Sequence, residues 1–485
     1  MKKYLAMMGL GIFSSTAMSS MYIYQPIGSS TTLGGYGNRH ALSTASGNPA
    51  STYLMANLQG FRVGFVGPLG IAIEGGGVGT LNDKIDDLND IFDADFTDNI
   101  DVDAIKTGAQ NAYNDEFAAN GGNTAGAEAA AEAYVISSID DVEIDINDRL
   151  GRASDVMSDI SETVYAKFAT TLQAPFLPII YKTRRRSVFT IDASASIVGR
   201  ASLLTDNLVL TGLDGFYDAG TVTELENADI SNAELETDTA AYIKRASDYR
   251  FSLGYSTMHS RSPTSALIVG GRLNFHKLAL GQKLTVLTED NDPSVSYSDF
   301  FISRDHVSTG ISLDLGASLI SRNFQLGVSV ANINEPKFKY EPIGNCAGLT
   351  LADLTNCNAA VDFAATGNIS LDETYKMEAQ VTVDAAIKSK DQHFSLAGSY
   401  DVNPIKDPLG DEYQWSVVSF SLFSDYILVP GIRAGIRRNL VGNELTYYTV
   451  GATLSRRLEV DLAYAPENDI GNSGLFFSMG YSFVF

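Results

Sequence analysis

The chain contains about 14 segments of roughly ten residues in which apolar side chains alternate with small or polar ones. Successive side chains of a β-strand point to opposite faces, so each segment predicts a strand with one apolar face. In the last segment, LFFSMGYSFVF, this face carries Leu475, Phe477, Met479, Tyr481, Phe483 and Phe485. Such an edge would promote aggregation at the end of a soluble chain, so the pattern favours a strand that meets lipid.

The alternating segments have the length and number expected of a membrane barrel. They lie near residues 61–76, 165–181, 187–198, 249–257, 265–287, 307–319, 324–333, 375–388, 393–402, 414–423, 428–437, 446–455, 457–464 and 475–485. Single-chain outer-membrane barrels use an even number of tilted strands. A closed barrel has no strand edge with unpaired backbone groups, which lipid could not hydrogen-bond. We therefore predict an all-β fold, an antiparallel transmembrane β-barrel of about 14 strands in the outer membrane, occupying residues 61–485.

The predicted connections alternate between short and long. The short ones are 182–186, 258–264, 320–323, 388–392, 424–427 and 455–457, and the long ones are 77–164, 199–248, 288–306, 334–374, 403–413, 438–445 and 465–474. Outer-membrane barrels have short periplasmic turns and longer extracellular loops. A soluble β-sandwich has no reason to alternate in this way, so the loop lengths support the barrel.

The N-terminus has the pattern of a secretory signal peptide over residues 1–19. Lys2 and Lys3 precede the apolar run YLAMMGLGIF, and Ala17 and Ser19 suit the −3 and −1 positions of signal-peptidase cleavage. The apolar run is about ten residues long, whereas a membrane-spanning helix needs about 20. Together with the barrel pattern, this predicts export to the outer membrane of a Gram-negative bacterium.

Residues 81–162 depart from the strand pattern and predict an acidic α-helical insertion in an extracellular loop. LNDKIDDLNDIF spaces its apolar residues at helical intervals, and AGAEAAAEAY consists of strong helix formers. Its carboxylates could bind calcium or bridge to lipopolysaccharide through divalent ions: Asp86, Asp87, Asp90, Asp140, Asp141 and Asp145. None fits the twelve-residue calcium loop, so a solvated helix face is favoured and no metal site is predicted.

Two other features concern loops and partners. Cys346 and Cys357 lie in one long loop, and two exported cysteines at close spacing predict a disulfide. A redox or metal pair would be expected to show a C-x-x-C motif and a nearby histidine, which the loop lacks. The formal net charge of −24 argues against direct contact with nucleic acid.

Residues 20–60 predict a plug inside the barrel. They are rich in Gly, Ser, Thr and Asn, so they cannot form a lipid-facing strand, and a lumen of this size can hold such a segment. Polar residues at inward positions of the strands are expected to line the lumen. These candidates are Arg272, Asn274, Glu378, Gln380 and Asp384.

The run LGGYGNRHALSTASGNPASTYLMANLQG resembles the N-terminal signature of FadL-like outer-membrane barrels. The C-terminal hairpins resemble those of the conjugal transfer TraF-like family, which is related also to PorV-type barrels. The resemblance implies 14 strands and an N-terminal hatch, with Asn48, Pro49 and Ala50 in the hatch motif. The last strand is similar to the C-terminal signal that barrel-assembly machinery recognises, which would be carried by Phe477, Tyr481, Phe483 and Phe485.

Motifs of enzymes and cofactor sites are missing from the sequence. There is no G-x-S-x-G, H-E-x-x-H, P-loop or C-x-x-C, and the histidines at 40, 259, 276, 306 and 393 lack metal-ligand spacing. We therefore predict neither catalysis nor a cofactor.

Two functions remain open from the sequence. The FadL resemblance implies a passive channel for small hydrophobic molecules, gated by the hatch. The alternative is a non-transporting envelope component or scaffold of a conjugation or secretion apparatus, which would bind an envelope protein through the insertion and long loops. Lipid, lipopolysaccharide and the assembly machinery are expected partners in either case. An apolar pocket below the hatch would favour uptake, and a lumen filled by charged pairs would favour a scaffold.

Overall fold

The computed structural model describes residues 28–56, 60–77, 81–92, 100–183, 187–287, 300, 306–424 and 426–484. The predicted signal peptide, the start of the predicted hatch and Phe485 lie outside these residues. The chain forms two compact units. Unit 1 comprises Met1–Gly76, Tyr165–Ser202 and Tyr242–Phe485, and unit 2 comprises Gly77–Val164 and Leu203–Ala241.

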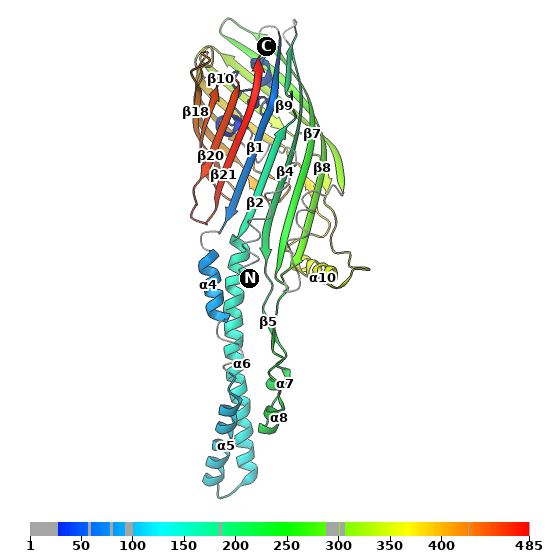
Figure 1. The fold of residues 1–485 in the computed structure, drawn as a ribbon, viewed down its shortest axis with the longest axis vertical. Helices are drawn as coiled ribbons and strands as arrows, with labels where there is room; N and C mark the ends of the chain where they lie inside the picture. The colour runs from blue at the N-terminus through cyan, green and yellow to red at the C-terminus, as the bar shows by residue number, and fades with distance from the viewer. Residues whose placement is uncertain are drawn as a thin grey trace. The chain divides into compact units, whose positions relative to one another are not determined.

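Unit 1 is a closed antiparallel β-barrel (Figure 1). Its strands are β1 (Gly60–Gly76), β2 (Tyr165–Gln173), β3 (Ile179–Lys182), β4 (Ser187–Leu204), β7 (Ala240–Arg261), β8 (Ser265–Val286), β9 (Val307–Ser321), β10 (Phe324–Ala331), β13 (Gln380–Lys388), β14 (Phe394–Asp401), β17 (Trp415–Leu422), β18 (Gly431–Asn439), β19 (Thr446–Leu454), β20 (Leu458–Ala465) and β21 (Ser473–Val484). Strands β2 and β3 share one position between β1 and β4, and β1 pairs with β21. The barrel therefore has 14 strand positions, which confirms the predicted fold.

The second strand position differs from the continuous segment predicted over 165–181. The strand is interrupted between Gln173 and Ile179, where Pro175 and Pro178 cannot donate to the sheet ladder. The wall stays attached there because Gly64 N donates to Pro178 O at 3.1 Å. A Cβ on Gly64 would overlap the carbonyl oxygen of Leu177, so only glycine allows this close approach.

The outward faces of the strands form the predicted apolar belt. On β7 the residues with this orientation are Tyr249, Phe251, Leu253 and Tyr255, each between 39% and 44% exposed. On β21, Leu475, Phe477 and Met479 are between 37% and 43% exposed, while Ser478 and Ser482 face inward. Tyr481 is half-buried. This distribution of apolar and polar side chains is that of a transmembrane β-barrel.

The predicted strand over 375–388 begins later than expected. β13 starts at Gln380, and the residues before it form β12 (Thr374–Lys376), which pairs with β11 (Lys337–Lys339) in a separate sheet. Tyr375 and Met377 alternate with the predicted inward residue Glu378, so a continuous strand would place them on the lipid face. They are instead buried inside the barrel at 7% and 3% exposure. Because this loop folds into the barrel, both side chains point inward. The alternation of apolar and polar residues in the sequence does not reveal this change.

The same long loop contains the predicted disulfide. Cys346 and Cys357 are bonded, with their Cα atoms 5.6 Å apart. Cys357 lies within α10 (Leu351–Ala365), so the bond ties this helix to the segment before it. A second small sheet, β15 (Ile405–Lys406) with β16 (Glu412–Tyr413), occupies the loop between β14 and β17.

Unit 2 is mainly helical and has its own core. It contains α4 (Leu81–Phe92), α5 (Val102–Ala119), α6 (Thr124–Thr163), α7 (Asp214–Tyr217), α8 (Val222–Asn227) and a sheet of β5 (Val209–Thr211) with β6 (Glu234–Glu236). Core residues include Leu88, Ile105, Val135, Ile139, Met157 and Phe216. The helices occupy the predicted insertion, but the contribution of the second connection, between β4 and β7, was not predicted. No described helix is long and apolar enough to cross a bilayer.

Candidate functional site

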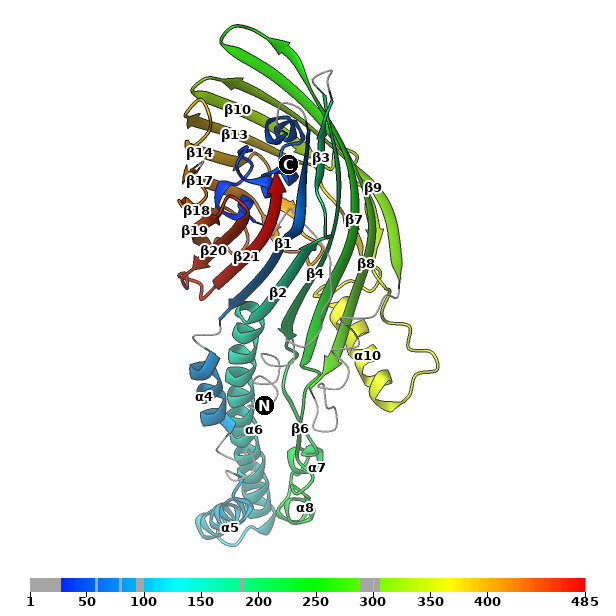
Figure 2. The ribbon, with the colours of Figure 1, turned by 45° about the horizontal axis from the view of Figure 1, so that its top comes forward.

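The hatch, residues 28–56, lies inside the barrel lumen (Figure 2). It consists of short helical turns: α2 (Ser30–Leu33), η1 (Leu42–Ser46), η2 (Pro49–Ser51) and α3 (Thr52–Met55). Its backbone bonds to distant strands, as Gly28 N donates to Ser478 Oγ at 2.7 Å and Gly35 N to Ser399 Oγ at 3.0 Å. Arg39 N donates to Gln392 Oε1 in a short turn between β13 and β14, so the hatch lies at the short-turn end of the barrel.

The Asn48-Pro49-Ala50 motif fixes the hatch to β9 and β10. Asn48 Oδ1 accepts from Ala50 N at 3.0 Å, and Asn48 Nδ2 donates to the carbonyl oxygens of Ala317 and Val328 at 3.1 and 3.2 Å. The side chain therefore caps the turn and anchors it to the wall. The motif is a structural turn that seats the hatch.

Two glycines make room for this turn. Gly270 on β8 and Gly316 on β9 lie opposite each other in the sheet register. A Cβ on Gly270 would lie 2.8 Å from Ala50 N, and one on Gly316 would overlap Asn48 Oδ1. The wall is thus shaped for close backbone approach by the hatch.

Carboxylates on β20 bind hydroxyl groups of the hatch. Glu459 Oε2 accepts from Ser29 Oγ and Ser43 Oγ at 3.0 and 2.9 Å, and Asp461 Oδ1 accepts from Thr32 Oγ1 at 3.1 Å. Hydrogen bonds to a charged acceptor are stronger than neutral ones. These contacts hold the first half of the hatch against β20.

Arg272 on β8 binds the middle of the hatch. Its guanidinium donates to the carbonyl oxygens of Ala45 and Gly47 at 3.3 and 3.4 Å. Asp314 on β9 neutralises it at 2.9 Å, and Asn274 Nδ2 donates to the same carboxylate at 2.8 Å. The charge of Arg272 is therefore paired, and its remaining donors are directed at the hatch.

Arg437 on β18 binds the start of the hatch. Its Nη1 donates to the carbonyl oxygens of Ser30 and Thr31, both at 3.2 Å. The guanidinium carbon lies 4.6 Å from the ring centre of Trp415. Arginines on two separate parts of the wall thus hold carbonyl groups of one small segment.

His40 closes the hatch against the short-turn end. Its ring stacks on Phe423 with centroids 5.2 Å apart and lies 4.9 Å from the ring of His393. His40 Nε2 also hydrogen-bonds to Asp391 O at 3.0 Å. Burial lowers the pKa of His40 to about 4, so its imidazole is neutral near pH 7.

The opposite end of the lumen is closed by aromatic side chains from inward-folded loops and strand ends. This aromatic layer consists of Phe338, Tyr340, Tyr375, Tyr413, Trp415, Tyr447 and Phe476, each at most 7% exposed. Tyr447 and Phe476 stack with centroids 4.5 Å apart, and Tyr413 and Trp415 stack at 5.6 Å. The layer buries apolar surface, which stabilises the inward position of the loops.

A buried lysine anchors the loop between β14 and β17. Lys167 Nζ on β2 lies 2.5 Å from Asp407 Oδ2, 2.6 Å from Asp411 Oδ2 and 2.7 Å from Tyr413 OH. Arg200 on β4 forms a further ion pair with Asp411. The loop is thus tied across the lumen to the strands opposite.

A chamber of about 160 Å³ remains between the hatch and the aromatic layer. The hatch contributes small and polar residues to it, and Tyr375, Met377 and Trp415 line its other end. The wall and loops contribute seven charged residues: Asp248, Arg250, Arg272, Asp314, Asp401, Asp407 and Arg437. The chamber is therefore polar and nearly balanced in charge.

The predicted lumen residues fall into three groups. Arg272, Asn274 and Gln380 line the chamber, whereas Asp384 is buried in the interior away from it. Glu378 precedes β13 and accepts from Lys406 N at 2.9 Å, so it is not part of the strand wall. Within the described part of the chain, no group of three or more His, Cys, Asp or Glu is arranged to hold a metal ion.

Several chamber residues were missed by the sequence analysis. Arg437 alternates with apolar residues in GIRAGIRR, so its inward position could have been recognised. Asp248 and Arg250 flank Tyr249 on β7 and carry the same signal. Asp407 comes from a loop, where alternation gives no information.

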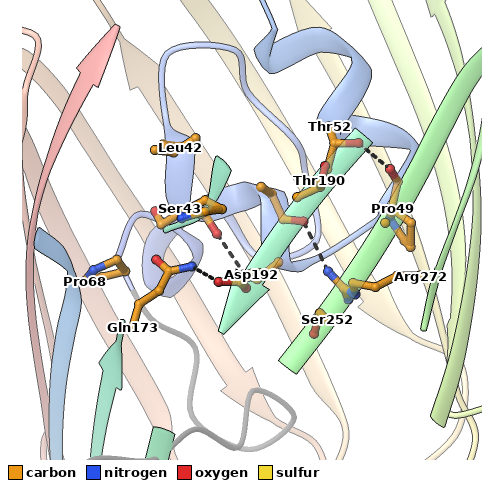
Figure 3. Close-up of a pocket in the computed structure, with 14 residues that line it drawn as sticks. Leu42, Ser43, Pro49, Thr52, Pro68, Gln173, Thr190, Asp192, Ser252 and Arg272 are labelled. Atoms are coloured by element: carbon orange, nitrogen blue, oxygen red, sulfur yellow. Dashed lines mark hydrogen bonds between the residues drawn. The ribbon is translucent and has the colours of Figure 1, made fainter. Parts of the chain in front are cut away.

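The hatch also packs closely against the interrupted part of the wall (Figure 3). A void of about 20 Å³ remains there, lined by hatch residues and by strands β1, β2, β4, β7 and β8. Gln173 Nε2 donates to Asp192 Oδ1 at 2.6 Å across this space, and Thr52 Oγ1 donates to Pro49 O at 2.9 Å within the hatch. The hatch therefore leaves little free volume on this side.

Solved structures with similarity to this chain include two toluene transporters and a FadL homologue. The toluene transporter TbuX of Ralstonia pickettii has 11% identity and a TM-score of 0.39, with 95% of this chain and 98% of that chain covered. The toluene transporter TodX of Pseudomonas putida has 10% identity and a TM-score of 0.37, with 96% and 99% covered. A Pseudomonas aeruginosa FadL homologue has 10% identity and a TM-score of 0.39, with 96% and 99% covered.

None of the curated proteins compared with the chain matches it. One family model does match, over residues 45–401, which is well over half of the chain. The matched range begins in the hatch and ends with β14. This match confirms the TraF-like resemblance: the chain belongs to the family described as F plasmid transfer operon, TraF, protein.

Proposed function

We propose that the protein is an outer-membrane channel, closed in the present state by the hatch at one end and the aromatic layer at the other. The chamber of about 160 Å³ between them carries this proposal. Protein interiors that serve only as structural cores are close-packed, with few voids larger than a water molecule. A polar chamber that lies between the hatch and the aromatic layer is instead the arrangement expected of a pathway narrowed at both ends.

The hatch is the proposed gate. Its contacts with Glu459, Asp461, Arg272 and Arg437 are hydrogen bonds, each of which exchanges for water at a small net cost. The aromatic layer instead buries apolar surface, which is costly to expose. Displacing the hatch as one N-terminal segment therefore costs less free energy than displacing the aromatic layer.

The solute and the location belong to the same proposal. The FadL resemblance implies a small hydrophobic solute, but the charged residues that line the chamber favour a polar one. We place the barrel in the outer membrane of a Gram-negative bacterium, reached through the signal peptide over 1–19 and the assembly machinery. The long connections would face lipopolysaccharide and the medium.

Conductance in planar bilayers tests the channel. We expect rare openings of the wild-type protein and more frequent openings of a variant that lacks residues 28–56. Sustained conductance is expected when this deletion is combined with Lys167→Met, because the aromatic layer otherwise still closes the other end of the lumen. A matched control replaces residues 81–162 by a short Gly-Ser turn, which leaves the lumen unchanged and should keep wild-type behaviour. If the hatch-deleted barrel stays silent even when the Lys167 anchor is removed by Lys167→Met, the protein is not a channel.

Two observations favour a second candidate, a non-transporting envelope component. The chamber is lined by charged residues, with Arg272 paired to Asp314, as expected above of a scaffold. Unit 2 has its own core and holds more than half of the 58 acidic residues of the chain but only four of its 34 lysines and arginines. Such a surface would attract a basic partner in a salt-dependent way. A photo-crosslinking residue at Ile136 or Ile144, which are 49% and 67% exposed, tests this. A single defined adduct in cells, together with silent lumen variants, would favour the scaffold.

A further inference from the structure

The chamber contains buried polar atoms that have no hydrogen-bond partner within the described structure. They are Asp248 Oδ1, Trp415 Nε1 and Arg437 Nε. Their residues line the chamber and are 1%, 3% and 6% exposed. A buried polar group without a partner destabilises the protein, so these atoms are expected to find a partner in the chamber contents.

The unpartnered atoms divide into an accepting side and a donating side. Asp248 lies on β7, and Arg437 lies on β18, seven positions away in the order of 14 strands. These strands are therefore on opposite sides of the barrel. Trp415, the third residue, lies next to Arg437 and also donates. One side suits a positively charged donor and the other suits a carboxylate.

The remaining charges of the chamber do not favour a net charge on the occupant. Three arginines face four aspartates, and one of these, Asp248, also contacts His276 Nδ1 at 3.0 Å. Arg272 is paired with Asp314 at 2.9 Å, so neither adds a free charge. A ligand that carries both charges fits this balance better than an anion or a cation.

The chamber volume limits the size of the occupant. At about 160 Å³, it is close to the engineered cavity of ~150 Å³ that holds benzene. A ligand of about six to ten non-hydrogen atoms would fill it. We propose that the chamber binds a small zwitterion of the size of a free amino acid, with its ammonium group at Asp248 and its carboxylate at Arg437 and Trp415.

This inference rests on the proposed function, because it names the class of solute that the channel holds. Binding can nevertheless be measured without flux. Trp415 is the only tryptophan of the chain and lines the chamber, so its fluorescence reports on the chamber alone.

The test uses L-threonine as the probe and the full-length barrel in detergent. Refolding the barrel in the presence of radiolabelled threonine avoids the question of whether a closed hatch admits it. We expect a saturable change in Trp415 emission and retained label. Threonine methyl ester, which lacks the anion, and N-acetylthreonine, which lacks the cation, should each bind at least about tenfold more weakly.

A variant pair assigns the effect to the chamber. Asp248→Asn should weaken threonine binding at least about tenfold but leave N-acetylthreonine unchanged, since only the ammonium partner is lost. Glu74→Gln, a buried carboxylate of β1 that does not line the chamber, should bind as the wild type does. Heat-modifiable mobility on gels shows that both variants are folded.

The outcomes separate this inference from the channel. Binding without conductance would support the zwitterion site and count against the channel. Conductance without threonine binding, or equal binding of all three probes, would overturn the zwitterion site and leave a water-filled chamber. Loss of binding in Glu74→Gln as well as Asp248→Asn would also overturn it, because the effect would then be general.

Discussion

Gly270 and Gly316 determine where the hatch can rest, because the Asn48–Ala50 turn occupies the space that their side chains would fill. The anchoring of Asn48 depends equally on the carbonyl groups of Ala317 and Val328, which any residue would supply. The hatch is therefore positioned by Gly270 and Gly316, which leave room for the turn, and by the side-chain amide of Asn48, which anchors it.

Gly316→Ala is predicted to loosen the hatch. The added methyl group overlaps Asn48 Oδ1, so the turn must move and the hydrogen bonds of Asn48 weaken. At about 1 kcal/mol per bond, two lost bonds should raise the open probability in bilayers by about tenfold or more. Gly398→Ala is the matched control, since its Cβ would meet Val417 O at an ordinary 3.8 Å. Equal behaviour of the two variants would contradict the role of the glycine pair.

His40 should make the hatch sensitive to acid. Its pKa is about 4 when buried, against 6.5 for an exposed imidazole, so the released hatch binds a proton more readily than the seated one. The free energy that favours the seated hatch over the released hatch is therefore unchanged above about pH 6.5. It falls by up to ~3 kcal/mol as the pH falls to 4. Arg39, Arg62 and His393 face the ring and add to the cost of its protonation.

Conductance measured between pH 7 and 4 checks this prediction, and openings should increase as the pH falls. His40→Phe should remove the dependence while keeping the stacking on Phe423. His259→Gln, at the exposed end of β7, serves as the control and should keep it. A pH profile that persists in His40→Phe would show that another group is responsible.

Among the elements of the fold, strands were predictable and loops were not. Leu475 and Phe477 alternate with inward residues because the strand pleat is local, and 14 segments could be found in this way. Tyr375 and Met377 have the same local pattern but point into the lumen, because β12 pairs with β11 and not with the barrel. Asp407 could not be assigned at all, since its position depends on Lys167, far away in the sequence.

The loop between β14 and β17 is predicted to depend on Lys167. Lys167→Met leaves Asp407 and Asp411 buried without their shared cation, and breaking such a buried pair costs about 3–5 kcal/mol. We expect the loop to detach and become sensitive to limited proteolysis between residues 402 and 414. Lys376→Met removes an exposed pair with Glu335 and should leave the protease resistance of the loop unchanged. Resistance of the Lys167 variant to protease would count against the anchor.

For the whole molecule, the division of charge between the two units has a thermodynamic consequence. Unit 2 holds an excess of acidic groups, whereas many of the barrel charges form buried pairs such as Arg433 with Asp461. Repulsion among exposed like charges weakens with salt, since the screening length is about 10 Å at 0.1 M. The two units are therefore expected to respond differently to ionic strength.

Thermal unfolding should show two transitions. The helical signal of unit 2, followed by circular dichroism at low salt, is expected to melt first and to shift upward by a few degrees on addition of 0.15 M NaCl. The barrel, followed by heat-modifiable mobility, should unfold at a higher temperature with little salt effect. A single transition with one salt dependence would mean that the units do not unfold separately.

The pairing of β1 with β21 joins the first and last strands of the barrel. The hatch precedes β1 in the chain, yet its partners Glu459 and Ser478 lie on the last two strands. During biogenesis the hatch consequently has no complete docking surface until the C-terminal residues have been made. Seating of the hatch is therefore expected at the same late stage of folding as closure of the β1–β21 seam.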